Sequence, residues 1–105
     1  MRTATMEDIR MLIDDNVRMD IWIPYPSKVN SRDFEYGCYR EHACDDLERY
    51  ISTCFSGYLE LDVDYIKQVL VRYIKCAERY ERYAGRNKMI FEHQIDVART
   101  LLQVL

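Results

Sequence analysis

Residues 61–85, LDVDYIKQVLVRYIKCAERYERYAG, contain the clearest helix signal in the chain. Asp62 stands where a helix N-cap is expected, because its carboxylate can accept a hydrogen bond from a backbone N–H of the first turn. Leu61 precedes it and Ile66 follows four residues later, which is the spacing of a hydrophobic staple. We therefore expect a helix to begin at Asp62.

The same stretch presents two opposite faces when it is drawn as a helix. Apolar residues recur at helical spacing along one side: Ile66, Val69, Leu70, Tyr73, Ala77, Tyr80 and Ala84. Gly85 follows, and glycine commonly ends a helix. The other side carries cations spaced 3, 4, 3 and 4 residues apart, within a sector of roughly 80°; this basic row consists of Arg72, Lys75, Arg79, Arg82 and Arg86. The pattern predicts an amphipathic helix over residues 62–84.

A second helix is expected over residues 87–105, antiparallel to the first across the turn at 85–87. Its main apolar face consists of Phe91, Ile95, Ala98, Leu102 and Leu105, and it is widened by Ile90, Val97, Leu101 and Val104. A helix this broadly apolar is buried on two sides or contacts another chain. We therefore also expect a homodimer that forms through residues 90–105.

The N-terminal third carries local signals of both helix and strand. Thr5 is placed to cap a helix that ends near residue 16, with Asp8 reaching back in a variant of the capping box. Residues 17–23 then alternate between apolar and polar side chains, a period of two that predicts a strand. The prolines that follow end this strand.

A lone strand leaves its backbone groups unpaired, so residues 17–23 need a partner. Residues 33–39 are the best candidate, because apolar side chains alternate there at Phe34, Tyr36 and Cys38. We therefore expect a small hairpin near the N-terminus, followed by a clear helix over residues 41–56.

A single helix over residues 32–56 is the competing interpretation. Residues in helical phase run through this whole stretch: Tyr36, Arg40, Ala43, Cys44, Leu47, Tyr50, Ile51 and Cys54. Gly37 would weaken such a helix by roughly 1 kcal/mol relative to alanine, and we favour the hairpin on that ground. Gly57 ends the helix in either case.

The length of 105 residues indicates one domain, because a second core could not be filled. Apolar residues make up 49% and charged residues 31% of the sequence, which is typical of a folded globular protein. We expect residues 1–105 to adopt a predominantly helical α+β fold with about four helices, a small N-terminal β-hairpin and a C-terminal antiparallel helix pair.

The distribution of charge and hydrophobicity also bears on the cellular compartment. Residues 1–16 mix acidic and basic side chains into every apolar run, so no secretory signal is expected. No segment approaches the roughly 18 consecutive apolar residues of a membrane helix. We expect a cytoplasmic protein with no membrane contact, whose reduced cysteines act mainly as small buried hydrophobes.

Charge is sorted along the chain. Residues 1–64 hold 14 Asp and Glu against 7 Lys and Arg, a net charge of −7, whereas residues 65–105 hold 4 against 8, a net charge of +4, and the two sum to −3. The basic row can therefore neutralise the acidic half of its own molecule or of a copy, or it can meet an acidic partner.

Cysteine and histidine residues are the candidates for metal binding or catalysis. Cys38, His42 and Cys44 all have side chains that bind zinc, but a structural site needs four ligands and the other candidates are scattered: they are Cys54, Cys76 and His93. Cys44 and Cys54 also fall on the apolar face of their helix, which favours burial without metal.

Cys38 and His42 could form a thiolate–base pair, yet no glycine-rich loop indicates a phosphate cradle or an oxyanion hole. We expect no metal, no cofactor and no enzymatic activity.

The remaining functional classes are binding modules. We expect a small acidic protein-binding module that occupies the basic, nucleic-acid-binding surface of a protein partner, such as a nucleic-acid-processing complex. Its expected contact residues are Asp45, Asp46, Glu48, Trp22, Tyr25, Tyr36 and Tyr39. Small acidic domains are common among phage and mobile-element inhibitors of host machinery, including anti-CRISPR proteins; this analogy is one of size and charge, and no family motif supports it.

The alternative is a nucleic-acid-binding regulator that uses the basic row. Tyr83 lies next to the row, and cations mixed with aromatic side chains contact phosphates and unstacked bases. Two acidic residues in the same segment, Glu78 and Glu81, and an overall pI near 5.3 count against this function.

Overall fold

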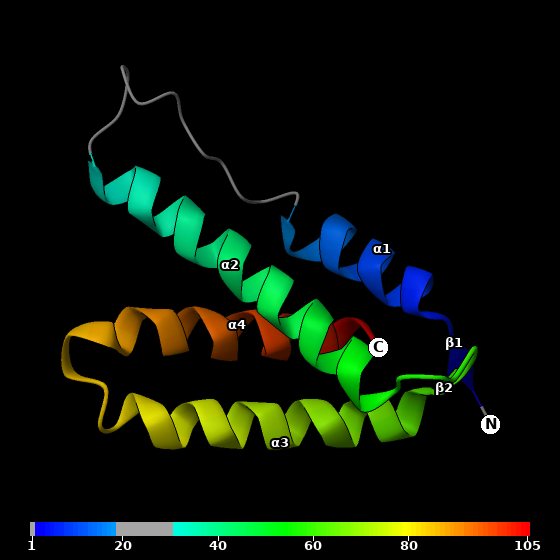
Figure 1. Ribbon diagram of the computed structural model, residues 1–105. Helices are drawn as coiled ribbons and strands as arrows, with labels where there is room; N and C mark the ends of the chain where they lie inside the picture. The colour runs from blue at the N-terminus through cyan, green and yellow to red at the C-terminus, as the bar shows by residue number, and fades with distance from the viewer. Residues whose placement is uncertain (1, 19–30) are drawn as a thin grey trace.

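The computed structural model describes residues 2–18 and 31–105, and the side chains of these residues except 31–37 and 86 (Figure 1). In this part of the chain the elements are β1 (Thr3–Ala4), α1 (Met6–Asn16), α2 (Ser31–Cys54), β2 (Leu61–Asp62), α3 (Val63–Glu81), a 3₁₀ turn (Gly85–Asn87) and α4 (Lys88–Val104). The expected α+β fold with a predominance of helix is confirmed. None of the described helices is both long and apolar enough to cross a bilayer.

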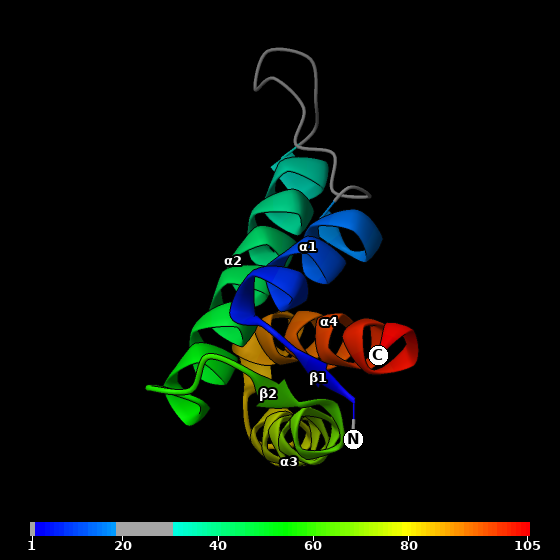
Figure 2. The same cartoon turned by 90° about the vertical axis from the view of Figure 1, so that its right-hand side faces the viewer.

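The helices pack around α4. α3 and α4 lie side by side and antiparallel, as expected, and α2 runs diagonally across α4 and ends near the start of α3 (Figure 1). α1 packs against both α2 and α4. In both views α3 lies on the opposite side of the molecule from α1 and the first half of α2 (Figure 2).

A two-stranded antiparallel sheet ties the N-terminus to the segment that enters α3. Thr3 lies opposite Asp62 and Ala4 opposite Leu61. The two strands are separated in the chain by α1 and α2, so they do not form the expected hairpin of sequential strands. Contacts between distant segments, rather than a local turn, create this sheet.

Thr5 begins α1 with the expected capping box. The backbone N–H of Thr5 donates to Asp8 Oδ2 at 2.9 Å, and the backbone N–H of Asp8 donates to Thr5 Oγ1 at 3.1 Å. These bonds satisfy N–H groups at the helix start that have no partner within the helix. Ile9 and Ile13, one turn apart, are fully buried in the core.

Residues 31–54 form one continuous helix, so the expected strand over 33–39 is wrong and the competing single helix is correct. Four apolar residues of α2 that share the helical phase are buried: Ala43, Cys44, Leu47 and Ile51. These four lie within residues 41–56, which are helical in either interpretation. Just before them, contacts with α4 hold the helix, because Tyr39 stacks on His93 and Arg40 pairs with Asp96. These tertiary contacts counter the cost of about 1 kcal/mol for Gly37.

The other expected strand, residues 17–23, lies mostly outside the described residues. Val17 caps the C-terminus of α1 and Arg18 follows in a 3₁₀ turn, so these first two positions do not form a strand. Residues 19–30, which include Trp22 and Tyr25, are not described.

Asp62 caps α3, as its position in the sequence predicts. Its Oδ1 atom accepts a hydrogen bond from the backbone N–H of Asp64 at 3.0 Å. Leu61 and Ile66, the expected staple pair, are both buried. The local cap thus predicts the N-terminal boundary of this helix, and pairing of Asp62 with Thr3 in the sheet also holds the chain at this point.

α3 ends at Glu81, although the helical pattern continues for three more residues. The N–H of Tyr83 donates to the carbonyl of Tyr80 at 3.1 Å, which tightens the last turn, and Gly85 turns the chain with a φ of +56°. Tyr80, expected on the buried face, is 62% exposed because it belongs to this last turn. Its ring stacks on Phe91 of α4 with centroids 5.9 Å apart.

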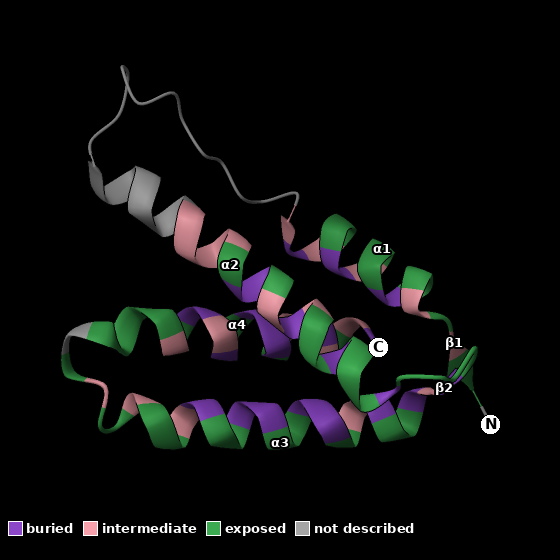
Figure 3. Ribbon diagram, viewed as in Figure 1, coloured by how far each residue is buried: buried purple, intermediate pink, exposed green. Residues whose placement is uncertain are grey.

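α4 contacts all three of the other helices. Val97, Ala98 and Leu101 are fully buried, whereas Ile90 is 37% exposed and Leu102 and Val104 are only partly buried. Figure 3 shows the buried residues on the sides of the helices that face one another. Packing within one chain therefore accounts for part of the width of this face, and the homodimer through residues 90–105 stays a prediction.

Candidate functional site

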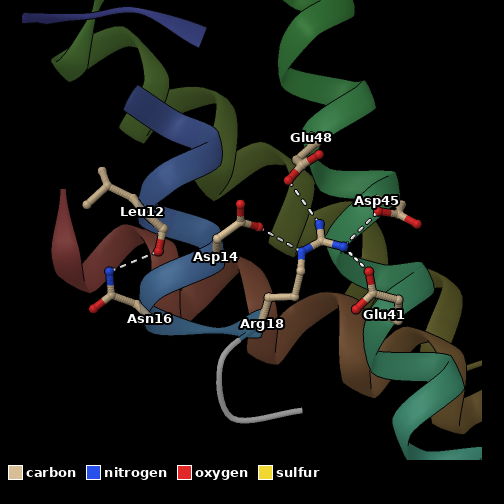
Figure 4. Close-up of polar contacts among 7 residues, drawn as sticks. All are labelled: Leu12, Asp14, Asn16, Arg18, Glu41, Asp45 and Glu48. Atoms are coloured by element: carbon tan, nitrogen blue, oxygen red, sulfur yellow. Dashed lines mark hydrogen bonds and ion pairs between the residues drawn. The ribbon is translucent and has the colours of Figure 1, made fainter. Parts of the chain in front are cut away.

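A guanidinium and four carboxylates meet between the end of α1 and the middle of α2 (Figure 4). Arg18 Nη1 lies 3.0 Å from Asp45 Oδ1 and also donates to Glu41 Oε1. Its Nη2 lies 2.9 Å from Glu48 Oε1, and its Nε lies 2.9 Å from Asp14 Oδ1. The three α2 carboxylates are spaced i, i+4 and i+7, so they project from one face of the helix. We call these five residues the Arg18 cluster.

The Arg18 cluster carries a net charge of −3, because one cation faces four carboxylates. Burial by itself lowers the pKa of Arg18, but the hydrogen bond to Asp45 and the charges of Glu41 and Glu48 outweigh it and raise this pKa above its ordinary value. The Arg18 side chain is only 23% exposed, so water screens these pairs incompletely. The cluster joins α1 to α2 and gives each of its carboxylates an internal partner.

Asp46 points toward α3 and α4 instead. Its Oδ2 atom accepts a hydrogen bond from the Tyr73 hydroxyl at 2.6 Å, and Gln94 Nε2 lies 3.5 Å from the same oxygen. Burial, and then the hydrogen bond to Asp46, raise the pKa of Tyr73 above its ordinary value, so its hydroxyl stays a donor. The Tyr50 ring packs on Tyr73 with centroids 5.0 Å apart. Asp46 therefore links three helices.

The expected acidic contact surface is thus divided between two places. Asp45 and Glu48 are paired with Arg18, whereas Asp46 bonds to α3 and α4. Asp45 and Asp46 do line one shallow cleft between α2 and α4, together with Tyr39. Glu48 does not line that cleft. The three acidic residues do not form one free patch.

The expected aromatic contacts are only partly described. Tyr39 is half-buried, and its ring stacks on His93 with centroids 6.4 Å apart and an interplanar angle of 26°. His93 is buried, and this burial, followed by the charge of Arg40, lowers its pKa below the ordinary 6.5. Tyr39 therefore contributes to the packing of α2 on α4. Three further groups lie outside the described part of the chain: Trp22, Tyr25 and the side chain of Tyr36.

The basic row lies on the outer face of α3, away from the core. Its four described side chains are exposed, and none has an ion pair with any described residue: they are Arg72, Lys75, Arg79 and Arg82. Arg72 Cζ lies 6.0 Å from the centroid of the Tyr65 ring, a cation–π contact. Tyr83, expected beside the row, is 84% exposed. The row does not pair with the Arg18 cluster, which lies between α1 and α2 on the other side of α4 from α3 (Figures 1 and 2).

The cysteine and histidine candidates do not converge. Cys44 faces the core and is fully buried, and this burial raises its pKa to about 11, whereas His42 is exposed. Cys54, expected to be buried, is exposed because α2 ends at that residue. Within the described residues, no group of three or more His, Cys, Asp and Glu side chains is arranged to hold a metal ion.

A surface that the sequence pattern did not single out lies between the end of α2 and the start of α3. Gly57 has a φ of +89°, and the chain beyond it presents Tyr58, which is 71% exposed, and Leu59, which is 91% exposed. Next to them is an open groove of about 640 Å³, lined by Thr3, Cys54, Phe55, Tyr58, Glu60, Asp62 and Tyr65. We call it the Tyr58 groove.

The small sheet forms one wall of the Tyr58 groove. Thr3 and Asp62 are paired across the strands, so their side chains point to the same face, toward the groove. Leu61 points the other way and is buried. On the helical side, the Phe55 and Tyr65 rings meet edge to face with centroids 5.4 Å apart. The groove is therefore held by elements that the core fixes in place.

The periodicity of the sequence could not reveal this groove. Residues 57–60 belong to no helical or strand period, so Tyr58 and Leu59 count only as loop residues. The sequence does carry one indication of an exposed contact surface. Two large side chains, Tyr58 and Leu59, come directly after the glycine that ends the helix, where loops ordinarily carry small or polar residues. Thr3 joins the groove only through its pairing with β2.

No protein-family model matches the chain, and neither a curated protein nor a solved structure is similar to it. Function is therefore inferred from the surfaces themselves. Among the described residues, two exposed surfaces stand out for their few internal contacts, the Tyr58 groove with Leu59 and the basic row on α3. The Arg18 cluster is a third, acidic surface whose four carboxylates share one internal cation.

Proposed function

We propose that this chain is a non-enzymatic protein-binding domain whose contact surface is the Tyr58 groove together with Leu59. The supporting observation is the near-complete exposure of two adjacent large side chains, 71% at Tyr58 and 91% at Leu59, beside a groove with aromatic walls. Single exposed apolar residues are common, but adjoining ones at a groove mark contact surfaces.

The size of these side chains suits an anchoring role. Burying a leucine fully on binding stabilises a complex by roughly 1.5–3 kcal/mol, and a tyrosine adds apolar area with a hydroxyl that stays hydrated at the rim. Tyrosine is also enriched among the residues that dominate binding energy. Because Phe55 is buried and the strands flank the groove, little ordering of the backbone is needed on binding.

Charge supports a basic partner. Residues 1–64 carry a net charge of −7, and two of their carboxylates, Glu60 and Asp62, lie at the groove itself. A domain of this charge would compete with nucleic acid for the basic groove of a nucleic-acid-processing protein, and its activity would be inhibition by occupancy. An origin in a phage or mobile element stays an analogy of size and charge.

Affinity capture with matched variants tests this proposal. The tagged wild-type chain, a Tyr58→Ala/Leu59→Ser variant and a Tyr83→Ala control are each incubated with lysate, with and without nuclease. Tyr83 is a suitable control because it is also a highly exposed tyrosine, at the other end of α3. A protein recovered with the wild type and the control after nuclease treatment, but lost with the groove variant, is the expected result. Equal recovery with all three chains would refute the groove as the contact surface.

Nucleic-acid binding through α3 is the second candidate, and it is favoured by the four described cations of the basic row, which have no ion pair with any described residue. If four cations contact phosphates, binding to duplex DNA should weaken with salt at a log–log slope of about −3 to −4. Fluorescence anisotropy on a labelled duplex and a labelled single strand measures this slope. Reversing Arg72 and Arg79 to glutamate should then abolish binding, and no binding by the wild type at low salt would exclude this candidate.

A further inference from the structure

We propose that the Tyr58 groove recognises an arginine side chain on an exposed segment of the partner protein, with apolar neighbours of that arginine packing on Leu59. This inference rests on the proposed protein-binding function and adds the chemistry of the group that is bound. It follows from the aromatic side chains and the carboxylates that line the groove.

Aromatic side chains provide the first half of this recognition. Phe55, Tyr58 and Tyr65 all line the groove, and the faces of such rings attract cations, most often arginine. The molecule itself contains one instance, because the guanidinium of Arg72 lies 6.0 Å from the centroid of the Tyr65 ring. A planar guanidinium stacks flat on a ring while its N–H donors point outward in a fixed fork, whereas a lysine ammonium is not planar and its donors rotate freely.

Carboxylates provide the second half of this recognition, because they can pair with the charge of the guanidinium. Glu60 and Asp62 line the groove, and no lysine or arginine is among its lining residues. Glu60 is exposed, and it forms no ion pair within the described part of the chain. Asp62 also caps α3, which uses its Oδ1 atom. A guanidinium in the groove could thus stack on a ring while donating to Glu60.

The Arg18 cluster shows why the groove, rather than the acidic surface, is the site for a guanidinium from outside. In the cluster, the carboxylates already surround a guanidinium of the chain itself. In the groove, the aromatic and acidic groups are present without a lining cation. Tyr65 already has Arg72 at its ring, so an incoming arginine would use Tyr58 and Glu60, which have no cation partner among the described residues.

A pair of peptides separates the contribution of the charge from that of the apolar contacts. The probes are acetyl-Gly-Leu-Arg-Leu-Gly-amide and the same peptide with citrulline, a neutral isostere, in place of arginine. Binding is followed by ¹⁵N–¹H NMR titration of the wild type, Glu60→Gln and Tyr58→Ala. The matched controls are Glu92→Gln and Tyr83→Ala, which remove an exposed carboxylate and an exposed ring near the opposite end of the molecule.

We expect the arginine peptide to shift amides of residues 54–65 and to bind roughly two- to fivefold more weakly to Glu60→Gln and to Tyr58→Ala, with both controls unchanged. The citrulline peptide should lose at least as much affinity. Equal binding of the two peptides would overturn the arginine inference while leaving the groove as a contact surface. Shifts confined to the Arg18 cluster, or no shifts at millimolar peptide, would also overturn it. The capture experiment with Tyr58→Ala/Leu59→Ser is independent of these outcomes, so failure of the two proposals can be told apart.

Discussion

Replacing Arg18 with methionine should destabilise the fold by about 1.5–3 kcal/mol. Methionine keeps much of the apolar stem but removes the charge that pairs with Glu41, Asp45 and Glu48 of α2. Exposed ion pairs contribute roughly 0.2–1 kcal/mol each, and these are at the upper end because Arg18 is only 23% exposed. Four carboxylates left without their cation also repel one another, which adds to the loss.

Thermal unfolding of Arg18→Met and of Arg99→Met provides a matched measurement. Among the described residues Arg99 pairs with Glu78 alone, at 2.7 Å, and both side chains are well exposed, at 58% and 41%. Its loss should cost less than about 0.5 kcal/mol. For a domain of this size, the loss at Arg18 corresponds to a Tm lowered by roughly 6–15 °C, and Arg99→Met should stay within about 3 °C of the wild type.

Salt provides the decisive comparison for Arg18→Met. At 1 M salt the screening length falls to about 3 Å, so repulsion among the remaining carboxylates weakens and part of the lost stability should return. Equal melting temperatures of Arg18→Met and Arg99→Met would refute the reasoning. So would a deficit of Arg18→Met that is independent of salt, because that loss would come from packing rather than charge.

Two further substitutions and one labelling experiment test the fold. Asp62→Ala should lower the free energy of unfolding by about 0.5–2 kcal/mol through loss of the α3 cap, and an unchanged denaturant midpoint would show that the cap contributes nothing. Cys54 and Cys76 should react with a thiol reagent in the folded protein, whereas Cys44, buried with a pKa raised to about 11, should react only on unfolding; fast labelling of all three would contradict its burial. Because the pKa of His93 is lowered in the folded state, the unfolded chain binds the proton first, so stability should fall as the pH drops below about 6.5. His93→Gln should reduce this dependence, and an unaltered pH profile of Tm would contradict the assignment.

Helix starts were the most predictable part of the fold. Thr5 with Asp8, and Asp62 with its flanking apolar residues, are patterns in which side chain and backbone interact within one turn. Such signals require no knowledge of the rest of the molecule. Residues 33–39 were predicted wrongly because their apolar positions fit both a period of two and the helical phase of α2. The choice depended on contacts with α4, such as Tyr39 on His93 and Arg40 with Asp96, which no local pattern contains.

The candidate surfaces were less predictable because they depend on which distant residues meet. Asp45 and Glu48 of α2 were identified from sequence, but their pairing with Arg18 depends on the position of the residue that follows α1. Exposure of the basic row follows from its position opposite the apolar face of α3. The Tyr58 groove combines the end of α2, the start of α3 and the N-terminal strand, segments that only the folded chain brings together.

Site-specific photo-crosslinking tests the central claim, that the chain binds a protein through the Tyr58 groove, most directly. The photoreactive residue p-benzoylphenylalanine replaces Leu59 in one chain and Tyr83 in another, and both positions are highly exposed, so the fold should tolerate either change. Irradiation in cells or lysate should give one discrete, nuclease-resistant protein adduct from position 59 and none from position 83. Adducts from position 83 alone, or the same adducts from both positions, would contradict the claim.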